Sequence, residues 1–210
     1  MCSARIVDHD HSADDSPDGQ AHTRGRHRSL ALAPVVTSDD GGTTGSTEGD
    51  AGSGQDDFDW EIGTWSTDVQ VLADPLSDRE DQWLPFAGIS IVRALMDRRA
   101  NIVELRVSGP GGQINGLNLR LYQPQARRWS STFTNMRDGM PAPSVHGGFH
   151  HGVGEFYGDD HLAGRQVKVR FLIHRQGPDR ARFEQAFSDD GGTSWETNWI
   201  AIDQRIDHGI

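Results

Sequence analysis

Ten short segments in which apolar and polar residues alternate follow one another along the sequence after residue 61. A period of two is typical of a β-strand with one buried face, and no stretch of twelve residues shows a convincing helical period of 3.6. The pattern therefore predicts an all-β chain. The expected strands are residues 62–72, 83–95, 101–108, 115–123, 128–135, 144–150, 152–158, 165–174, 181–188 and 194–204.

Short links rich in Gly, Pro and Asp separate many of these segments. The clearest of them are residues 97–99, 109–112, 124–126, 138–141, 177–179 and 189–192. Links this short join antiparallel neighbours, so they predict a meander. A meander this wide does not stay flat, and closing it into an up-and-down barrel of about 8–10 strands removes its exposed edges. A two-sheet β-sandwich is the alternative, although its crossing connections usually need at least one longer link.

The first part of the chain, residues 1–57, differs from the rest in composition. It holds four Arg against eleven Asp and Glu, a net charge of −7 out of the formal −11 of the whole chain. Runs of Asp, Gly, Thr and Ser such as residues 39–46 cannot bury enough apolar surface to offset the loss of chain entropy. We therefore expect a disordered acidic leader at residues 1–57 and one β-barrel domain at residues 58–210.

Charge and cysteine content argue against several kinds of partner. The chain has no basic stripe, which nucleic acids and anionic membranes both require, so we expect neither as a partner. The single cysteine, Cys2, excludes an internal disulfide framework. No apolar run is long enough to span a membrane, and the first residues lack the apolar core of a signal peptide. These features predict a cytoplasmic protein.

Three motifs carry a resemblance to a known family. They are Phe58–Trp65 (FDWEIGTW), Leu119–Pro124 (LRLYQP) and Phe183–Phe187 (FEQAF). In this order they resemble a family of largely uncharacterised bacterial lipocalin-like (calycin) β-barrel proteins, and the resemblance covers residues 58 to about 206. It implies that an Arg from the last strand lies over the indole of the Gly-x-Trp motif. Arg205 is placed to make this contact with Trp65, worth roughly 0.5–2 kcal/mol as a cation–π interaction.

A further motif, Ser188–Trp195, follows the pattern Ser-x-Asp-x-Gly-x-Ser/Thr-Trp and resembles the Asp-box turn of sialidase-type propellers. A propeller needs several copies, and the sequence holds one. We therefore interpret it as a hairpin staple, in which Ser188 and Asp190 accept hydrogen bonds from loop N–H groups and Trp195 covers the turn.

The face of each strand that points inward decides what a ligand in the barrel would meet. One choice places apolar residues inside, including Leu117, Leu119 and Leu121 on one strand and Trp195 near the last strand. With the strands oriented in this way, the lumen has aromatic walls and a few polar groups, which suits a mostly apolar ligand. An ordinary packed core without a ligand has the same composition. The ligand-binding candidates are Trp129, Phe133, Asn135, Phe171, Gln185, Thr197 and Trp199.

The opposite choice of face gathers charged residues that form a solvated surface with ion pairs if they point outward. If they point inward, Arg120 and Tyr122 could bind a carboxylate, as in calycin barrels with an Arg/Tyr cluster, and a Glu beside an Arg could act as general acid or base. The catalytic candidates are Glu104, Arg120, Tyr122, Arg170 and Glu184.

Two groups of histidines suggest a metal site, and each meets a geometric objection. The leader pair His9 and His11 has no fixed geometry, and we expect no metal site there. His146 and His150 would be ligand-spaced on a helix, but glycines between them favour a strand, which sets them about 13 Å apart. We expect no cofactor, with haem bound by a single His as the minor alternative.

These observations lead to a first hypothesis and two alternatives. The first is a lipocalin-like barrel that binds a small, mostly apolar or aromatic organic molecule in its lumen. The second is a cofactor-free cyclase, isomerase or lyase that acts on a natural-product-like substrate in the same cavity. The third is an interaction module whose leader docks a partner or occupies the barrel mouth. A homodimer is left open, and any chemistry is expected at the end of the barrel away from Trp65.

Overall fold

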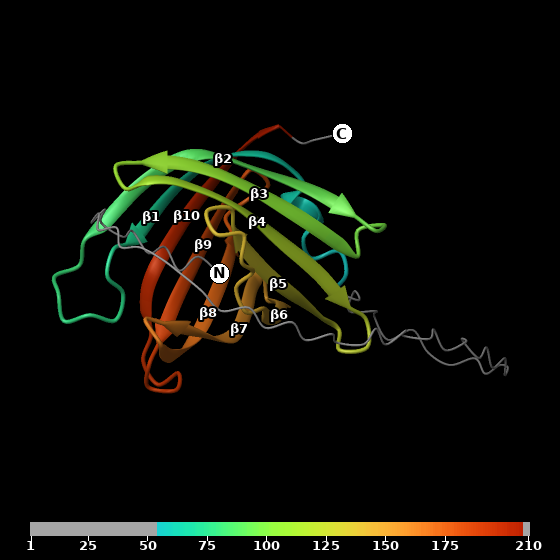
Figure 1. The fold of residues 1–210 in the computed structure, drawn as a ribbon. Coiled ribbons are helices and arrows are strands. Elements are labelled where there is room, and N and C mark those ends of the chain that lie inside the picture. Colours follow the sequence, from blue (N-terminus) through green and yellow to red (C-terminus); the bar gives the residue numbers. More distant parts are fainter. Residues whose placement is uncertain (1–53, 208–210) are drawn as a thin grey trace, which may run out of the picture. The chain divides into compact units, whose positions relative to one another are not determined.

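The computed structural model describes residues 54–207 of the chain, so the predicted disorder of residues 1–53 lies outside the described residues. One short 3₁₀ helix and ten strands follow in order (Figure 1). They are η1 (Asp59–Glu61), β1 (Gly63–Leu72), β2 (Trp83–Leu95), β3 (Ala100–Gly109), β4 (Gly112–Gln123), β5 (Arg128–Asn135), β6 (Val145–His150), β7 (Val153–Leu162), β8 (Arg165–Arg175), β9 (Arg180–Ser188) and β10 (Glu196–Asp207). The predicted all-β class is confirmed.

The strands form one closed antiparallel barrel in which each strand pairs with its neighbours in sequence. β1 and β10 close the ring, with Thr67 opposite Asp203 and Trp65 opposite Arg205. The up-and-down barrel is therefore confirmed over the sandwich. Pairing is shortest between β5 and β6, where three residue pairs join the strands.

Two tight hairpins show how local sequence sets the meander. His151 and Gly152 between β6 and β7 both have positive φ, 51° and 83°, and so do Ala163 and Gly164 between β7 and β8, at 51° and 82°. Two successive residues with positive φ are the signature of a type I′ turn, whose twist matches that of the paired strands. A Gly at the second position relieves the strain of this conformation.

Strand β4 shows where the sequence prediction was wrong. Leu119 and Leu121 point outward with exposed fractions of 39% and 45%, whereas Asn118 and Arg120 are buried inside the barrel. The segment alternates leucines with longer polar residues, so the pattern alone fits either face. Two tertiary features support the observed choice: Arg120 finds a buried carboxylate partner, and Gly116 lies where a Cβ would meet the Phe133 ring at 2.1 Å.

The base of the barrel is sealed by Trp65. The Arg205 guanidinium carbon lies 4.0 Å from the centre of the Trp65 ring, which confirms the predicted contact. Arg205 also donates hydrogen bonds to the carbonyl oxygens of Trp60 and Ile62, so it ties β10 to η1 as well as to β1. First and last strands are thus joined by side chains as well as by backbone pairing.

Residues 54–57, which the sequence prediction assigned to the leader, contact the barrel. The Trp129 indole N–H donates to the Gly54 carbonyl oxygen at 2.8 Å. The division of the chain at residue 58 stays a prediction. Within residues 54–207 no helix is both long and apolar enough to cross a membrane.

Candidate functional site

A buried ion pair lies at the end of the barrel that η1 covers. Arg120 of β4 donates to both carboxylate oxygens of Glu61, at 2.6 Å and 3.2 Å. The two side chains have exposed fractions of 3% and 2%. The Arg120 guanidinium also lies over the Phe58 ring, 4.2 Å from its centre. A buried, bidentate pair of this kind fixes both side chains, and each would be an uncompensated charge without the other.

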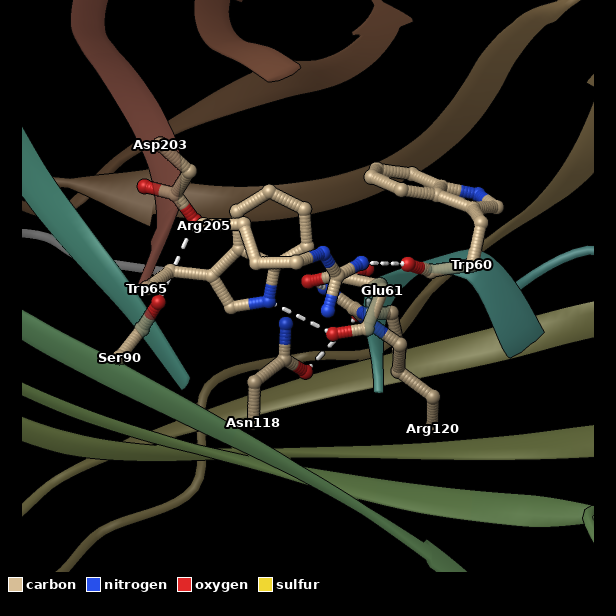
Figure 2. Close-up of polar contacts among 9 residues, drawn as sticks. Trp60, Glu61, Trp65, Ser90, Asn118, Arg120, Asp203 and Arg205 are labelled. Carbon is tan, nitrogen blue, oxygen red and sulfur yellow. Dashed lines mark hydrogen bonds and ion pairs between the residues drawn. The ribbon is translucent and has the colours of Figure 1, made fainter. Parts of the chain in front are cut away.

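Glu61 is held in place by the motif that begins the barrel. The Trp65 indole N–H donates to the Glu61 carbonyl oxygen at 2.7 Å, which fixes the short helix η1 against the base (Figure 2). Trp60 stands edge-on to Trp65, with ring centres 6.0 Å apart. The FDWEIGTW segment therefore positions a carboxylate as well as closing the barrel.

A second carboxyl group, that of Asp203 on β10, is also buried inside the barrel. Its Oδ2 accepts a hydrogen bond from the Ser90 hydroxyl at 3.2 Å (Figure 2). The hydroxyl oxygens of Ser90 and Thr67 are themselves 3.0 Å apart. Its Oδ1 is buried and has no hydrogen-bond partner. An unpartnered buried carboxyl oxygen is costly, because desolvation is not offset.

The environment of Asp203 favours its neutral form. Burial of the carboxyl group, followed by the nearby negative charge of Glu61, raises the pKa of Asp203 from its ordinary value of 3.8 to about 7. Hydrogen bonds from Thr67 and Ser90, and the positive charge of Arg120, act in the opposite direction and are outweighed. A buried carboxyl group that titrates near neutrality is a recognised mark of acid–base sites.

These groups line one lumen cavity of about 90 Å³. Its lining joins a polar cluster at one end to apolar and aromatic walls. The polar cluster consists of Glu61, Thr67, Ser90, Asn118, Arg120 and Asp203. The remaining lining residues are Val103, Leu105, Phe133, Phe171, Phe183, Gln185, Trp199 and Ala201.

Two buried hydrogen bonds join amide and hydroxyl side chains, and one partner of each bond lines the cavity. The Asn118 side-chain oxygen accepts from the Ser131 hydroxyl at 2.8 Å. Gln185 donates to the Asn198 side-chain oxygen at 2.9 Å, while the Asn198 Nδ2 is buried with no hydrogen-bond partner. Buried hydrogen bonds of this kind restrict the rotamers of the side chains that they join.

The structure separates the ligand-binding candidates into two groups. Four of them line the cavity: Phe133, Phe171, Gln185 and Trp199. The other three do not. Trp129 packs edge-on against Phe58, Asn135 accepts a hydrogen bond from the Arg137 backbone, and Thr197 lies at an irregularity in the pairing of β10 with β9. Their proposed role in binding stays a prediction.

The catalytic candidates are likewise not brought together. Arg120 lines the cavity, and Tyr122 is buried beside Trp129 with ring centres 5.5 Å apart. The three others belong to the outer face and have partners there. Glu104 pairs with Arg93 and Arg106, Glu184 pairs with Arg182, and the Arg170 guanidinium lies over the Trp195 ring.

Trp195 occupies a different place from the predicted lumen position. Its ring packs against Tyr157, with centres 6.2 Å apart, beside the turn that it covers. The turn itself is stapled as predicted: the Asp190 carboxylate accepts hydrogen bonds from the N–H groups of Thr193 and Ser194, and Ser188 accepts one from Gly192. Hydrogen bonds from the Ser194 backbone N–H and from the hydroxyl groups of Ser188 and Ser194 hold the pKa of Asp190 well below its usual range.

Sequence reasoning missed the most unusual groups of the cavity, Glu61 and Asp203. The Glu61 carbonyl oxygen accepts a hydrogen bond from Trp65, so the polar cluster begins beside the base of the barrel. The expectation that any chemistry lies at the end away from Trp65 stays a prediction. A signal for Asp203 was present. It follows Trp199 and Ala201 at a spacing of two on the inward face of β10, so it interrupts an otherwise apolar inward run.

Histidines do not gather around the cavity. His146 and His150 lie on β6 and His151 in the turn that follows, and none of them lines the cavity. Between residues 54 and 207, no three His, Cys, Asp or Glu side chains come close enough to hold a metal ion. The metal-binding possibility at His9 and His11 falls outside the described residues.

The fold and the cavity define a class: a ten-stranded closed antiparallel barrel with a polar end to its lumen. No family model matches the chain, and no curated protein matches it. Solved structures with a similar chain trace include the S-type phycobiliprotein lyase CPES from Guillardia theta. It is 9% identical with a TM-score of 0.49, and the match covers 71% of this chain and 90% of that one.

Designed proteins also resemble the barrel. The redesigned β-barrel mFAP1, solved with DFHBI bound, is 12% identical with a TM-score of 0.39, and the match covers 71% of this chain and 98% of that one. A fluorescence-activating β-barrel designed de novo is 11% identical, with the same TM-score of 0.39 and the same coverage of both chains. At such identities and TM-scores the likenesses carry no argument about function.

Proposed function

We propose that this protein binds a small organic molecule with a mostly apolar body and one polar group in the lumen of its barrel. The observation that carries the proposal is the cavity of about 90 Å³, in which aromatic walls meet a hydrogen-bonding end. Concave apolar sites with a few convergent polar groups are the usual form of small-molecule sites. The resemblance of the sequence to lipocalin-like proteins favours the same interpretation.

Charge limits the class of ligand. The Arg120 guanidinium is balanced by the Glu61 carboxylate, so the pair contributes no net charge to the cavity. Asp203 adds either nothing or a negative charge, depending on its protonation. An anionic ligand therefore has no unbalanced cation to meet among the residues that line this cavity, and an uncharged molecule with a hydrogen-bond acceptor fits best. This argues against the carboxylate ligand that an inward Arg/Tyr pair would suggest.

The volume of the cavity limits the class of ligand further. An apolar cavity of ~150 Å³ holds benzene. A cavity of about 90 Å³ is smaller than that, so the probe should have few non-hydrogen atoms. Cyclopentanone, an apolar ring with one acceptor oxygen, is therefore a suitable first probe.

The test is binding of cyclopentanone followed by ligand-observed NMR, together with native mass spectrometry for a co-purified molecule. Ala201→Leu extends a side chain into the space that the ligand would occupy. A misfit of one methylene in a hydrophobic pocket is worth about 1–3 kcal/mol, so affinity should fall about tenfold or more. Ala87→Leu makes the same chemical change at an exposed position of β2 and should leave affinity unchanged. Equal binding by both variants would show that the probe is not in the lumen.

A cofactor-free enzyme is the second candidate, and one observation favours it. Asp203 is a buried carboxyl group on the cavity wall whose pKa lies near neutrality, as a general acid or base requires. A cytoplasmic location, a homodimer and a part in natural-product biosynthesis stay predictions.

A further inference from the structure

The cavity holds one carboxyl group whose hydrogen bonding is incomplete. Asp203 has an exposed fraction of 5%, lines the cavity, and leaves its Oδ1 without a partner. Glu61, by contrast, uses both carboxylate oxygens in its bond to Arg120. The Glu61 carboxylate is thus held by Arg120, whereas the Asp203 carboxyl group keeps one oxygen available for a bound molecule.

The groups around Asp203 come from strands β1, β2, β4 and β9 and from η1. The strands on either side of it place uncharged residues opposite, Thr67 on β1 and Ala181 on β9. Ser90 of β2 donates to it. The charged groups that act on it are Glu61 and Arg120, while the guanidinium of Arg205, two residues along β10, lies over Trp65.

We propose that the lumen cavity catalyses proton transfer on a small, uncharged carbonyl compound, with the Asp203 carboxyl group as both the base that removes the proton and the acid that returns it. The inference rests on the proposed binding function, since the same cavity must hold the substrate. Its chemistry needs neither a nucleophile nor a cofactor.

The reaction balances within the substrate and one side chain. The Asp203 carboxylate takes a proton from the carbon between a carbonyl group and a C=C bond, and the electron pair of that C–H bond forms a dienolate. Negative charge develops on the carbonyl oxygen. The Asp203 carboxyl group then gives the proton to the far carbon of the former double bond, so the C=O is restored and the double bond becomes conjugated. Nothing is oxidised, reduced or consumed.

The cavity also holds hydrogen-bond donors for the developing charge. A guanidinium has five N–H donors, and Arg120 uses two of its groups for Glu61. Arg120 and Asn118 line the same cavity as Asp203. Donors held in place by the protein stabilise a developing oxyanion without having to reorganise during the reaction. The aromatic walls, including Phe133 and Trp199, hold the hydrocarbon part.

The pKa of Asp203 suits a group that first removes a proton and then returns it. A pKa of about 7 leaves a substantial share of the group ionised at neutral pH and keeps it strong enough as an acid to return the proton. The turnover rate should therefore rise as the pH increases through about 7, where the base form appears. A general acid–base group typically contributes a rate factor of about 10²–10⁴.

The experiment uses the full chain and cyclopent-3-enone, whose conversion to cyclopent-2-enone is followed by the absorbance of the conjugated enone. Asp203→Asn keeps the shape and removes the titrating group, so we expect turnover to fall at least ~100-fold while binding of cyclopentanone is retained. Asp159→Asn makes the same chemical change at an exposed residue of β7, so it is the matched control and should match the unmodified protein in rate and pH profile.

Each outcome separates the two proposals. Loss of turnover with retained binding in the Asp203→Asn variant supports the inference. If the unmodified protein binds cyclopentanone but isomerises cyclopent-3-enone no faster than Asp203→Asn does, the inference is overturned and the binding function stands. If the unmodified protein binds neither ketone, the proposed function fails and the inference fails with it.

Discussion

The titration of Asp203 has a consequence for stability that can be worked out from the structure. Its pKa is about 7 in the folded protein and 3.8 in an unstructured chain. Between these values the folded state holds a proton that the unfolded state has released. Stability rises with pH where the unfolded state binds more protons, so here it falls as the pH rises from about 4 to about 7.

The size of the effect follows from the same two values. A difference of about three pKa units, at 1.36 kcal/mol each, lowers the unfolding free energy by about 4 kcal/mol across this window. Below pH 4 the carboxyl group is protonated in both states, and above pH 7 it is ionised in both, so the contribution is constant outside the window. Asp203→Asn removes the titration and keeps an acceptor for Ser90.

The assay is urea unfolding of the unmodified protein and of Asp203→Asn at pH values from 4 to 9, followed by tryptophan fluorescence. The other titrating groups are the same in both proteins, so their effects cancel in the difference. We expect the variant to gain about 4 kcal/mol relative to the unmodified protein between pH 4 and pH 8. A difference that does not change with pH would mean that Asp203 is ionised throughout, and the case for proton transfer would lose its support.

Three further predictions concern the ion pair, the sheet and the stapled turn. Arg120→Met should lower the unfolding free energy by about 3–5 kcal/mol because it strands a buried carboxylate, and adding Glu61→Gln should restore part of the loss; a double variant as unstable as the single would refute this. Gly147→Ala should destabilise by about 1–3 kcal/mol in chemical unfolding, because its Cβ would lie 1.8 Å from a backbone oxygen of β7. Gly148→Ala has open space and should stay within about 0.5 kcal/mol. Asp190→Ala should speed hydrogen exchange at the loop amides that it binds, with the barrel amides still protected, and an unchanged loop would contradict the staple.

The positions of the strands could be predicted because they depend on neighbours in the sequence. Alternation fixes each strand and Gly, Pro or Asp marks each reversal, so β2 and β5 begin and end at the predicted residues. The contact between Trp65 and Arg205 could also be expected, since it follows from a resemblance that specifies both partners. The strand positions follow from residues within one segment, and the Trp65–Arg205 contact follows from two residues that the resemblance specifies.

The contents of the cavity could not be predicted in the same way. In β4 the leucines and the polar residues alternate with equal regularity, so the side that faces inward depends on whether Arg120 meets a partner. That partner, Glu61, comes from η1, and Asp203 comes from the last strand. A buried charge is stable only where distant segments supply its counter-charge and hydrogen bonds, and that juxtaposition arises when the barrel closes. Local alternation and turn residues were thus enough to predict the barrel. The polar groups of the lumen come together only through contacts between distant segments of the folded chain.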